Sequence, residues 1–305
     1  MRLSKKIKRS VTYAFVSGLL VLFNAIPRRV AICLGSWIGL VLWRLFGRER
    51  HRMVRHLTLA YGDTLSLRQK EKIGQTFCVN TGRNLADVIR FRKHFEHNIK
   101  PLITAEGMEH FETANKRGKG IIGVTGHIGN FELMAAFIQS QGYNCGVIGR
   151  EMYDERLGRL LIENRKAVGL TCFSTTDSPK KIISWIRQGN VLGVLIDTDS
   201  HRVRSEFIPA FGRWSNTPIG QTILGLKTGA TFIPAACLRT EDNRYHVIVR
   251  PPVEIEPSGD FDTDVYNTTL ACTKALEEII HEHKDQWIWL HNRWHTERTI
   301  PGKRV

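Results

Sequence analysis

Residues 121–140, IIGVTGHIGNFELMAAFIQS, decide the fold. The segment opens with an apolar run, Ile121–Val124, that predicts a buried strand. It closes with Phe131–Ser140, which predicts a helix, and the glycine-containing turn 126–130 lies between the two. A strand that passes through a short turn into a helix is the repeating unit of a parallel sheet.

The same alternation continues toward the end of the chain. Further apolar runs predict strands at Cys145–Ile148, Leu170–Phe173, Val191–Ile196, Phe232–Leu238 and Tyr245–Arg250. Helices are expected between and after them, at Glu155–Ala167, Pro179–Arg187, Ile219–Thr228 and Thr263–His283. This order predicts an α/β fold, with a mostly parallel central sheet and helices on both faces. Ligands of such sheets bind at the carboxyl ends of the strands.

The first 47 residues differ in composition from the rest of the chain. Uncharged runs span Ser10–Pro27 and Val30–Trp43, and basic residues flank both of them. A helix that crosses a bilayer needs about 20 apolar residues, and these runs have 18 and 14. We expect 1–47 to be a helical membrane anchor, inserted as a hairpin or lying flat; two buried core helices are the alternative. The functional domain is expected at 48–305, with a helical lead-in at 48–106 and the α/β core at 107–305.

The charge balance restricts the class of partner. The chain has 44 Lys and Arg against 29 Asp and Glu, which gives a net charge of +15 at pH 7. Such a surface favours nucleic acid, acidic lipid, phosphorylated substrates or acidic proteins. Because no nucleic-acid-binding motif is present and basic residues gather around the apolar runs, we expect a membrane with anionic lipids and no nucleic acid. The flanking positive charge predicts that the domain lies on the cytosolic face.

The turn after the first strand carries the candidate chemistry. Glu132 falls in the first helical turn, where the helix dipole keeps a carboxylate ionised, and from there it can reach one nitrogen of His127. The other ring nitrogen is then free to accept a proton. Gly126 and Gly129 let a ligand approach the backbone, and the amides that follow Asn130 can stabilise an oxyanion. No Ser or Cys stands beside His127, so the pair suits activation of a substrate hydroxyl; a capped turn with a structural histidine is the alternative.

Several motifs stand in a fixed order along the chain. The box TGHIGNFE occupies residues 125–132, and Arg150 follows the next strand. Later come Asp197-Thr198-Asp199, Phe211-Gly212, Thr217-Pro218-Ile219-Gly220, Thr228-Gly229-Ala230, Pro234 and the block WIWLHNRW at 287–294. This ordered set resembles the bacterial lipid A late acyltransferases, the lauroyl and myristoyl transferase family, whose box is H-x4-(D/E). Phe131 stands where that family often has Trp.

The resemblance implies an activity, a place and a site. The activity is transfer of a fatty acyl chain from acyl carrier protein to a hydroxyl of a lipid A precursor, without a covalent enzyme intermediate, cofactor or metal. The place is the cytoplasmic face of the bacterial inner membrane. The catalytic residues would be His127 and Glu132. The substrate-binding residues would be Gly129, Asn130, Arg150, Asp197 and Arg293.

Three of the expected substrate-binding residues also have other possible roles. Arg150 suits a substrate phosphate or the oxyanion, and a surface salt bridge is its alternative. Asp197 suits orientation of Arg150 or of the acceptor, and a structural acid at a strand end is its alternative. Arg293 suits an anion, unless its flanking tryptophans only pack it against the fold.

The activity has rivals as well. A glycerolipid or glycolipid acyltransferase with another acceptor would carry the same box. Asp197-x-Asp199 resembles the metal-binding D-x-D of glycosyltransferases, a motif that is short and often accidental. The histidine pairs 281/283 and 291/295 suggest zinc, but solvated or packed histidines are the favoured interpretation.

Overall fold

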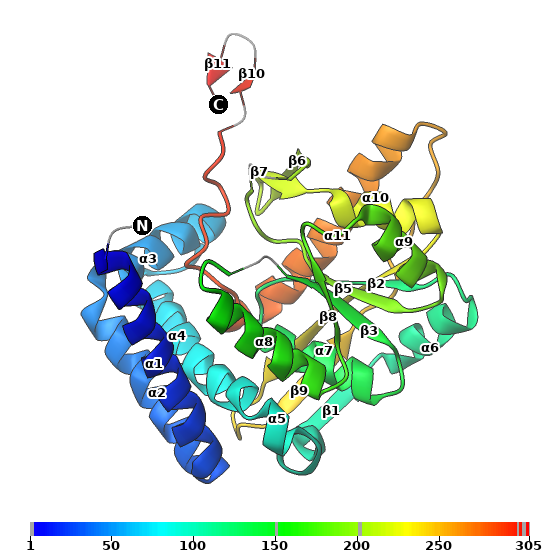
Figure 1. Cartoon of the computed structure of the whole chain (residues 1–305). Coiled ribbons are helices and arrows are strands. Elements are labelled where there is room, and N and C mark those ends of the chain that lie inside the picture. The colour runs from blue at the N-terminus through cyan, green and yellow to red at the C-terminus, as the bar shows by residue number, and fades with distance from the viewer. Residues whose placement is uncertain (1–2, 150–151, 201–202, 298, 301–302, 305) are drawn as a thin grey trace.

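A seven-stranded sheet forms the centre of the protein, seen in Figure 1. The computed structural model describes residues 3–149, 152–200, 203–297, 299–300 and 303–304. The strand order is β1-β9-β8-β2-β5-β3-β4, and only the β8–β9 pair is antiparallel. The bounds are β1 Ile103–Glu106, β2 Ile121–Thr125, β3 Cys145–Gly149, β4 Thr171–Ser174, β5 Val191–Leu195, β8 Thr231–Arg239 and β9 Tyr245–Val249. The prediction of a mostly parallel sheet is confirmed.

Helices cover both faces of this sheet. On one face α6 (Met108–Lys116) and α7 (Phe131–Ser140) pack over the central strands, in one core with α5 (Phe91–His94). On the other face lie α9 (Pro179–Arg187), α10 (Gly220–Thr228) and α11 (Phe261–Glu282). Helix α8 (Glu155–Ala167) packs beside β4 and α5. Helices on both faces are therefore confirmed, and α7, α8 and α9 begin and end at the predicted residues.

Several smaller elements complete the chain and were not predicted. A two-stranded hairpin, β6 (Ser205–Ala210) and β7 (Arg213–Pro218), packs against α11. At its tip Phe211 has a φ of 53°. The remaining short elements are η1 Gly62–Thr64, η2 Phe95–Ile99, η3 Lys100–Leu102, η4 Lys284–Gln286, β10 Thr299–Ile300 and β11 Lys303–Arg304.

The four long helices at the start of the chain are α1 Leu3–Ala25, α2 Arg28–Leu45, α3 Gly47–Tyr61 and α4 Leu67–Ile89. Helices α2 and α4 lie in backbone contact. A Cβ atom added to Gly35 would be 2.4 Å from the carbonyl oxygen of Gly82, and one on Gly39 would be 2.2 Å from that of Cys78. The small residues therefore let α4 pack directly on the second of the two N-terminal helices, and α4 in turn reaches the α/β core.

The outer faces of α1 and α2 are apolar and uncovered, on the side of the molecule away from α9 and α10 (Figure 1). Exposed side chains there include Val11, Phe15, Val21, Val30, Trp37 and Leu45. Among the described residues no single helix is long and apolar enough to cross a bilayer. Helix α2 and the segment Gly47–Thr64 reach that length only together, across a bend of 89°.

Candidate active site

The sheet brings two predicted site residues together. His127 follows the carboxyl end of β2, and Asp197 follows the carboxyl end of β5. Because these strands are parallel neighbours, both ends lie at one edge of the sheet. Gly126 makes the approach possible, since a Cβ atom there would lie 2.7 Å from Oδ2 of Asp197. The site therefore lies where α/β sheets bind ligands.

Asp197 is the carboxylate that holds His127. Its Oδ1 accepts a hydrogen bond from Nδ1 of His127 at 2.8 Å, and its Oδ2 accepts one from the His127 backbone amide at 2.7 Å. Nε1 of Trp287 donates to the same Oδ2 at 2.8 Å. An ionised carboxylate only accepts, so Nδ1 carries the proton and Nε2 has a free lone pair. No residue in the described part of the chain bonds Nε2.

The electrostatics of the pair favour proton uptake by His127. Burial lowers the pKa of His127, but the charge and hydrogen bond of Asp197 and the charge of Glu132 outweigh it, so the pKa lies above its ordinary value. Asp197 is almost wholly buried, which opposes its ionisation. The charge of His127 and the three donated hydrogen bonds nevertheless hold the pKa of Asp197 at about 2. The pair is therefore an ionised acid beside a base.

Glu132 does not bond the imidazole, which corrects the expected His127–Glu132 contact. Its oxygens accept from Nε and Nη2 of Arg165 at 2.9 and 2.5 Å. Burial opposes the charge of Arg165, and Glu132 raises the pKa of this guanidinium above its ordinary value. The expectation failed because Nδ1 is occupied by Asp197, while α8 places a cation directly opposite the first turn of α7. Glu132 acts on His127 through its charge alone.

Several backbone groups of the turn that carries His127 are bonded to other elements. The amide of Gly129 donates to the carbonyl of Gln286 at 2.9 Å, and the amide of Asn130 donates to that of Cys237 at 2.7 Å. Gly129 has a φ of 57°, and a Cβ atom there would lie 2.0 Å from the Cys237 oxygen. Gly126 and Gly129, expected to make room for a ligand, thus make room for Asp197 and for β8.

Asn130 caps helix α7. Its Oδ1 accepts from the amide of Leu133 at 3.1 Å, and its Nδ2 donates to Oη of Tyr245 at 3.1 Å. The side chain is buried and both of its polar atoms are bonded inside the protein. The backbone of Asn130 and Gly129 nevertheless borders the hollow in front of His127. Substrate binding by either residue stays a prediction.

A hollow of about 270 Å³ opens in front of His127, whose side chain is 26% exposed. Apolar side chains from α4, α7, α8 and the segment after η4 line it: Phe77, Leu85, Val88, Phe131, Leu161 and Ile288. Its polar side chains are Asn80, Thr81, Asn84, His127, Glu132 and Gln286. The base therefore faces a largely apolar space with a few polar groups, the usual composition of a small-molecule site.

The guanidinium of Arg293 is bonded inside the protein and is not an open anion site. Arg293 is buried, and its guanidinium donates to the carbonyls of Thr198 and Asn216 and to Oγ1 of Thr217. Burial lowers the pKa of Arg293 to about 10, although Asp197 and Asp199 act against this. The arginine thus fixes the loop after β5 to β7. Arg150 lies outside the described residues.

The D-x-D motif does not form a paired site. Asp197 binds His127 and Trp287, whereas Asp199 accepts from the amide and Oγ1 of Thr296 at 2.8 and 2.6 Å. The two carboxylates share no hydrogen-bond partner among the described residues. Within those residues no three His, Cys, Asp or Glu side chains gather as metal ligands would. The geometry thus gives the glycosyltransferase alternative no support.

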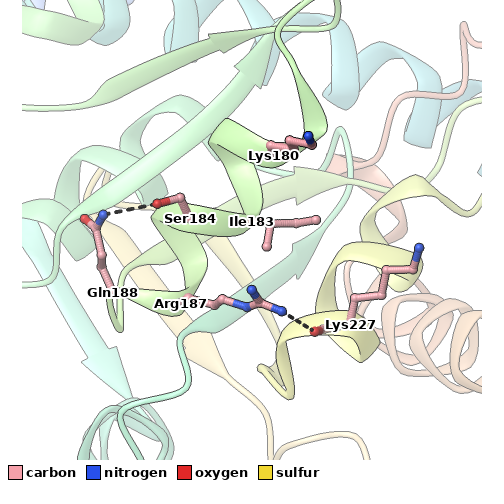
Figure 2. Close-up of a pocket in the computed structure, with 6 residues that line it drawn as sticks. All are labelled: Lys180, Ile183, Ser184, Arg187, Gln188 and Lys227. Atoms are coloured by element: carbon pink, nitrogen blue, oxygen red, sulfur yellow. Dashed lines mark hydrogen bonds between the residues drawn. The ribbon is translucent and has the colours of Figure 1, made fainter.

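A second hollow, of about 510 Å³, lies between α9 and α10 (Figure 2). Lys180, Arg187 and Lys227 line it together with Ile183, Ser184 and Gln188, and Arg187 donates to the carbonyl of Lys227 at 3.5 Å. Its lining includes no histidine and no carboxylate. It can attract an anion, but it has no group to move a proton, so the His127 hollow is the candidate active site.

The sequence did not indicate a role for three residues of the site: Arg165, Trp287 and Asn84. Arg165 pairs with Glu132, Trp287 donates to Asp197, and Nδ2 of Asn84 donates to the carbonyl of Gly129 at 2.9 Å. Trp287 belongs to a quoted motif but had no assigned role. Arg165 and Asn84 carry no local signal, because each acts through a residue distant in sequence.

This fold and site are those of an α/β protein with a histidine–carboxylate pair at an apolar pocket, an arrangement suited to proton transfer beside a fatty substrate. The model of one family, bacterial lipid A biosynthesis acyltransferase, matches residues 2–296. The chain belongs to the bacterial lipid A biosynthesis acyltransferase family, which is membrane-associated.

Curated relatives agree with this assignment. The chain is 24% identical over 280 residues to the lipid A biosynthesis lauroyltransferase of Escherichia coli, which covers 92% of this chain and 90% of that protein. It is 21% identical over 275 residues to a lipid A biosynthesis acyltransferase of Haemophilus influenzae, covering 89% and 83%. A phosphatidylinositol mannoside acyltransferase of Mycobacterium tuberculosis is 23% identical over 192 residues, covering 62% and 58%.

Proposed function

We propose that this acyltransferase moves a fatty acyl chain from acyl carrier protein to a hydroxyl of a lipid A precursor, with His127 as the general base. The observation that carries the proposal is the free Nε2 of His127 at the apolar hollow, with Nδ1 bonded to an ionised Asp197. Nε2 accepts the hydroxyl proton as the oxygen attacks the thioester carbon. The C–S bond then breaks, and the leaving thiolate takes the proton back from Nε2 of His127.

Two backbone amides support the transition state in this proposal. The amides of Phe131 and Glu132 open α7 and have no hydrogen-bond partner in the described part of the chain. They lie at the positive end of the helix dipole, beside the hollow that His127 faces. We assign them to the oxyanion that forms when the hydroxyl attacks the thioester.

The choice of substrates rests on charge and on the relatives. A net charge of +15 suits an acidic carrier protein and a phosphorylated lipid acceptor. The lauroyltransferase named above favours a lipid A precursor as acceptor. A different glycolipid acceptor is the second candidate, because the matched mannoside acyltransferase acts on another lipid class.

Substrate pairs decide between these candidates. Full-length protein in detergent is mixed with acyl carrier protein thioester or acyl-CoA, and with a lipid A precursor or a phosphatidylinositol mannoside. Mass spectrometry of the lipids follows. We expect acylation of the lipid A precursor with the carrier-protein donor. Acylation of the mannoside alone would overturn the proposed acceptor. Transfer from acyl-CoA alone would overturn the proposed donor.

Membrane association is proposed to use the outer faces of α1 and α2, on the cytoplasmic face of the inner membrane. Trp37 is 62% exposed on α2, among apolar neighbours, and the basic helix α3 follows α2 in the chain. Helix α2 keeps its other face on α4, so we infer that the pair lies in the interface with one side toward lipid. The arginines of α3 would then meet anionic headgroups.

Trp37→Glu is expected to weaken binding to vesicles that contain anionic lipid by about 10-fold or more, because it removes an apolar side chain from lipid and adds a negative charge. Sedimentation with vesicles measures the effect. Phe261→Glu is the matched control, since Phe261 is 42% exposed at the start of α11, away from the two helices. Equal binding by both variants would refute the proposed lipid-facing surface.

Glu132→Gln is expected to lower kcat/KM by about 10-fold or more. The change leaves the charge of Arg165 without its partner and removes the negative charge that raises the pKa of His127. Glu163→Gln on α8 is the matched control, because Glu163 only makes an exposed salt bridge with Arg92. Unchanged turnover by Glu132→Gln would remove Glu132 from the mechanism.

A further inference from the structure

Helix α4 forms one wall of the hollow, and that wall changes character along its length. Its lining side chains are Phe77, Asn80, Thr81, Asn84, Leu85 and Val88, which share one face of the helix. The wall is thus apolar at both ends and polar in the middle, opposite the turn that carries His127. An extended fatty acyl group has the same distribution of polarity, because it is apolar except at its carbonyl linkage.

Two of the three polar side chains are used inside the protein. Oγ1 of Thr81 donates to the carbonyl of Phe77 at 2.8 Å. Nδ2 of Asn84 donates to the carbonyl of Gly129 at 2.9 Å, and its Oδ1 accepts from Nε of Arg239 at 2.9 Å. Asn84 therefore joins α4 to the catalytic turn, and its amide oxygen and one of its two N–H donors are bonded inside the protein.

Asn80 is the exception. Its residue surface is only 8% exposed, and its Oδ1 accepts from Nη1 of Arg83 at 3.5 Å. Because a guanidinium only donates, the amide oxygen must face Arg83, which leaves the amide nitrogen toward the hollow. Nδ2 of Asn80 has no partner among the described residues. Nδ2 is not among the fully buried atoms that lack a partner, although the residue is almost wholly buried, so this donor is open to the hollow and can bind a ligand there.

We propose that Asn80 is a substrate-binding residue that donates a hydrogen bond from Nδ2 to the carbonyl oxygen of a fatty acyl group in the hollow. Asn80 lies about 6 Å along α4 from Asn84, which touches the catalytic turn. The carbonyl therefore lies close to the reacting centre, either in the donor thioester or in the acyl linkage of the acceptor. This inference rests on the proposed acyl transfer and adds a residue that selects for an acyl carbonyl.

The test is Asn80→Leu in the full-length protein, with kcat, both KM values and Tm measured. We expect kcat/KM to fall by about 10-fold or more. We also expect Tm to stay close to the wild-type value, because the change removes only one long hydrogen bond within the protein, the 3.5 Å contact from Arg83. Asn80→Asp, which keeps the shape but places an acceptor against the carbonyl, should lower kcat/KM at least as far.

Asn190→Leu is the matched control. Asn190 is also 8% exposed, but it lies before β5 at the opposite edge of the sheet. Its Nδ2 donates to the carbonyl of Trp185 at 3.0 Å, and its Oδ1 accepts from Nδ2 of Asn144 at 3.1 Å. The control should therefore lower Tm and leave kcat/KM within about twofold.

The kinetic parameter that changes shows whether Asn80 binds the carbonyl of the donor or that of the acceptor. A higher KM for the donor, or a lower kcat with both substrates saturating, assigns the thioester carbonyl. A higher KM for the acceptor assigns its acyl linkage. Wild-type kcat/KM in Asn80→Leu and Asn80→Asp would overturn the inference, as would a loss matched by a fall in Tm like that of Asn190→Leu. An inactive wild type would instead refute the proposed function.

Discussion

His127→Ala is expected to lower kcat for acyl transfer by about 10³-fold, the range over which a positioned general base acts. Without the imidazole, the carboxylate that remains at the hollow is Glu132, and both of its oxygens are held by Arg165. Asp197 cannot replace the imidazole, because it is almost wholly buried and does not line the hollow. Radiolabelled acyl transfer to lipid, followed by thin-layer separation, measures a loss of this size.

The loss must come from chemistry and not from folding. His127 is partly exposed, and its side chain bonds only Asp197, so Tm and vesicle binding should stay close to wild type. His246→Ala is the matched control, because His246 contacts Thr104 and Glu106 at the β1–β9 edge of the sheet. Turnover near the wild-type rate in His127→Ala would remove the proposed base.

Asp197→Asn is expected to lower kcat/KM by about 10²-fold or more. An asparagine can donate its amide hydrogen to Nδ1, which moves the imidazole proton to Nε2 and blocks proton uptake. It also removes the charge that stabilises the protonated imidazole. Asp199→Asn is the matched control. The carboxylate of Asp199 accepts hydrogen bonds from Thr296 and Asn216 and does not contact His127.

The pH profile separates these causes from a general loss of structure. His127 acts in its neutral form, so kcat/KM should rise with pH through its pKa, which Asp197 and Glu132 hold above the ordinary value of 6.5. Removing the charge of Asp197 lowers that pKa, so the acid limb should move to lower pH while the plateau falls. An unmoved limb in Asp197→Asn would show that this carboxylate does not control the imidazole.

Local sequence predicted the elements that have a strong apolar pattern. Helix α7 and strand β2 form as expected, because apolar spacing, an Asn cap and two glycines all agree there. Strand β1 was missed, since Ile103–Glu106 is short and mostly exposed and is ordered by pairing with β9. The β6–β7 hairpin was missed as well, because its packing against α11 decides it.

The sequence predicted which residues belong to the site, but not which of them form hydrogen bonds with each other. His127, Glu132 and Asp197 were all named, yet the partner of His127 lies 70 residues away along the chain. That partner follows only from the placement of β5 beside β2, and local periodicity does not encode strand order. Arg165 reaches Glu132 by the same kind of long-range placement on α8.

The N-terminal segment shows a similar limit. Its apolar runs and basic flanks predicted helices over 10–27 and 30–43, and α1 and α2 form there. The expected boundary at residue 47, between the anchor and the functional domain, is crossed by helix packing. Gly35 and Gly39 bring α2 against α4, and α4 also lines the hollow. The spacing of these two glycines by four residues was the available signal for close helix packing.

One rapid-quench experiment tests the central claim, direct transfer to a lipid hydroxyl, most directly. Full-length protein is mixed with equimolar acyl carrier protein thioester and lipid A precursor, and intact masses of the protein and the lipid are recorded over time. We expect the lipid to gain one acyl group while the protein mass never changes. An acylated protein that forms before the product, or a lipid that gains no acyl group, would contradict this account.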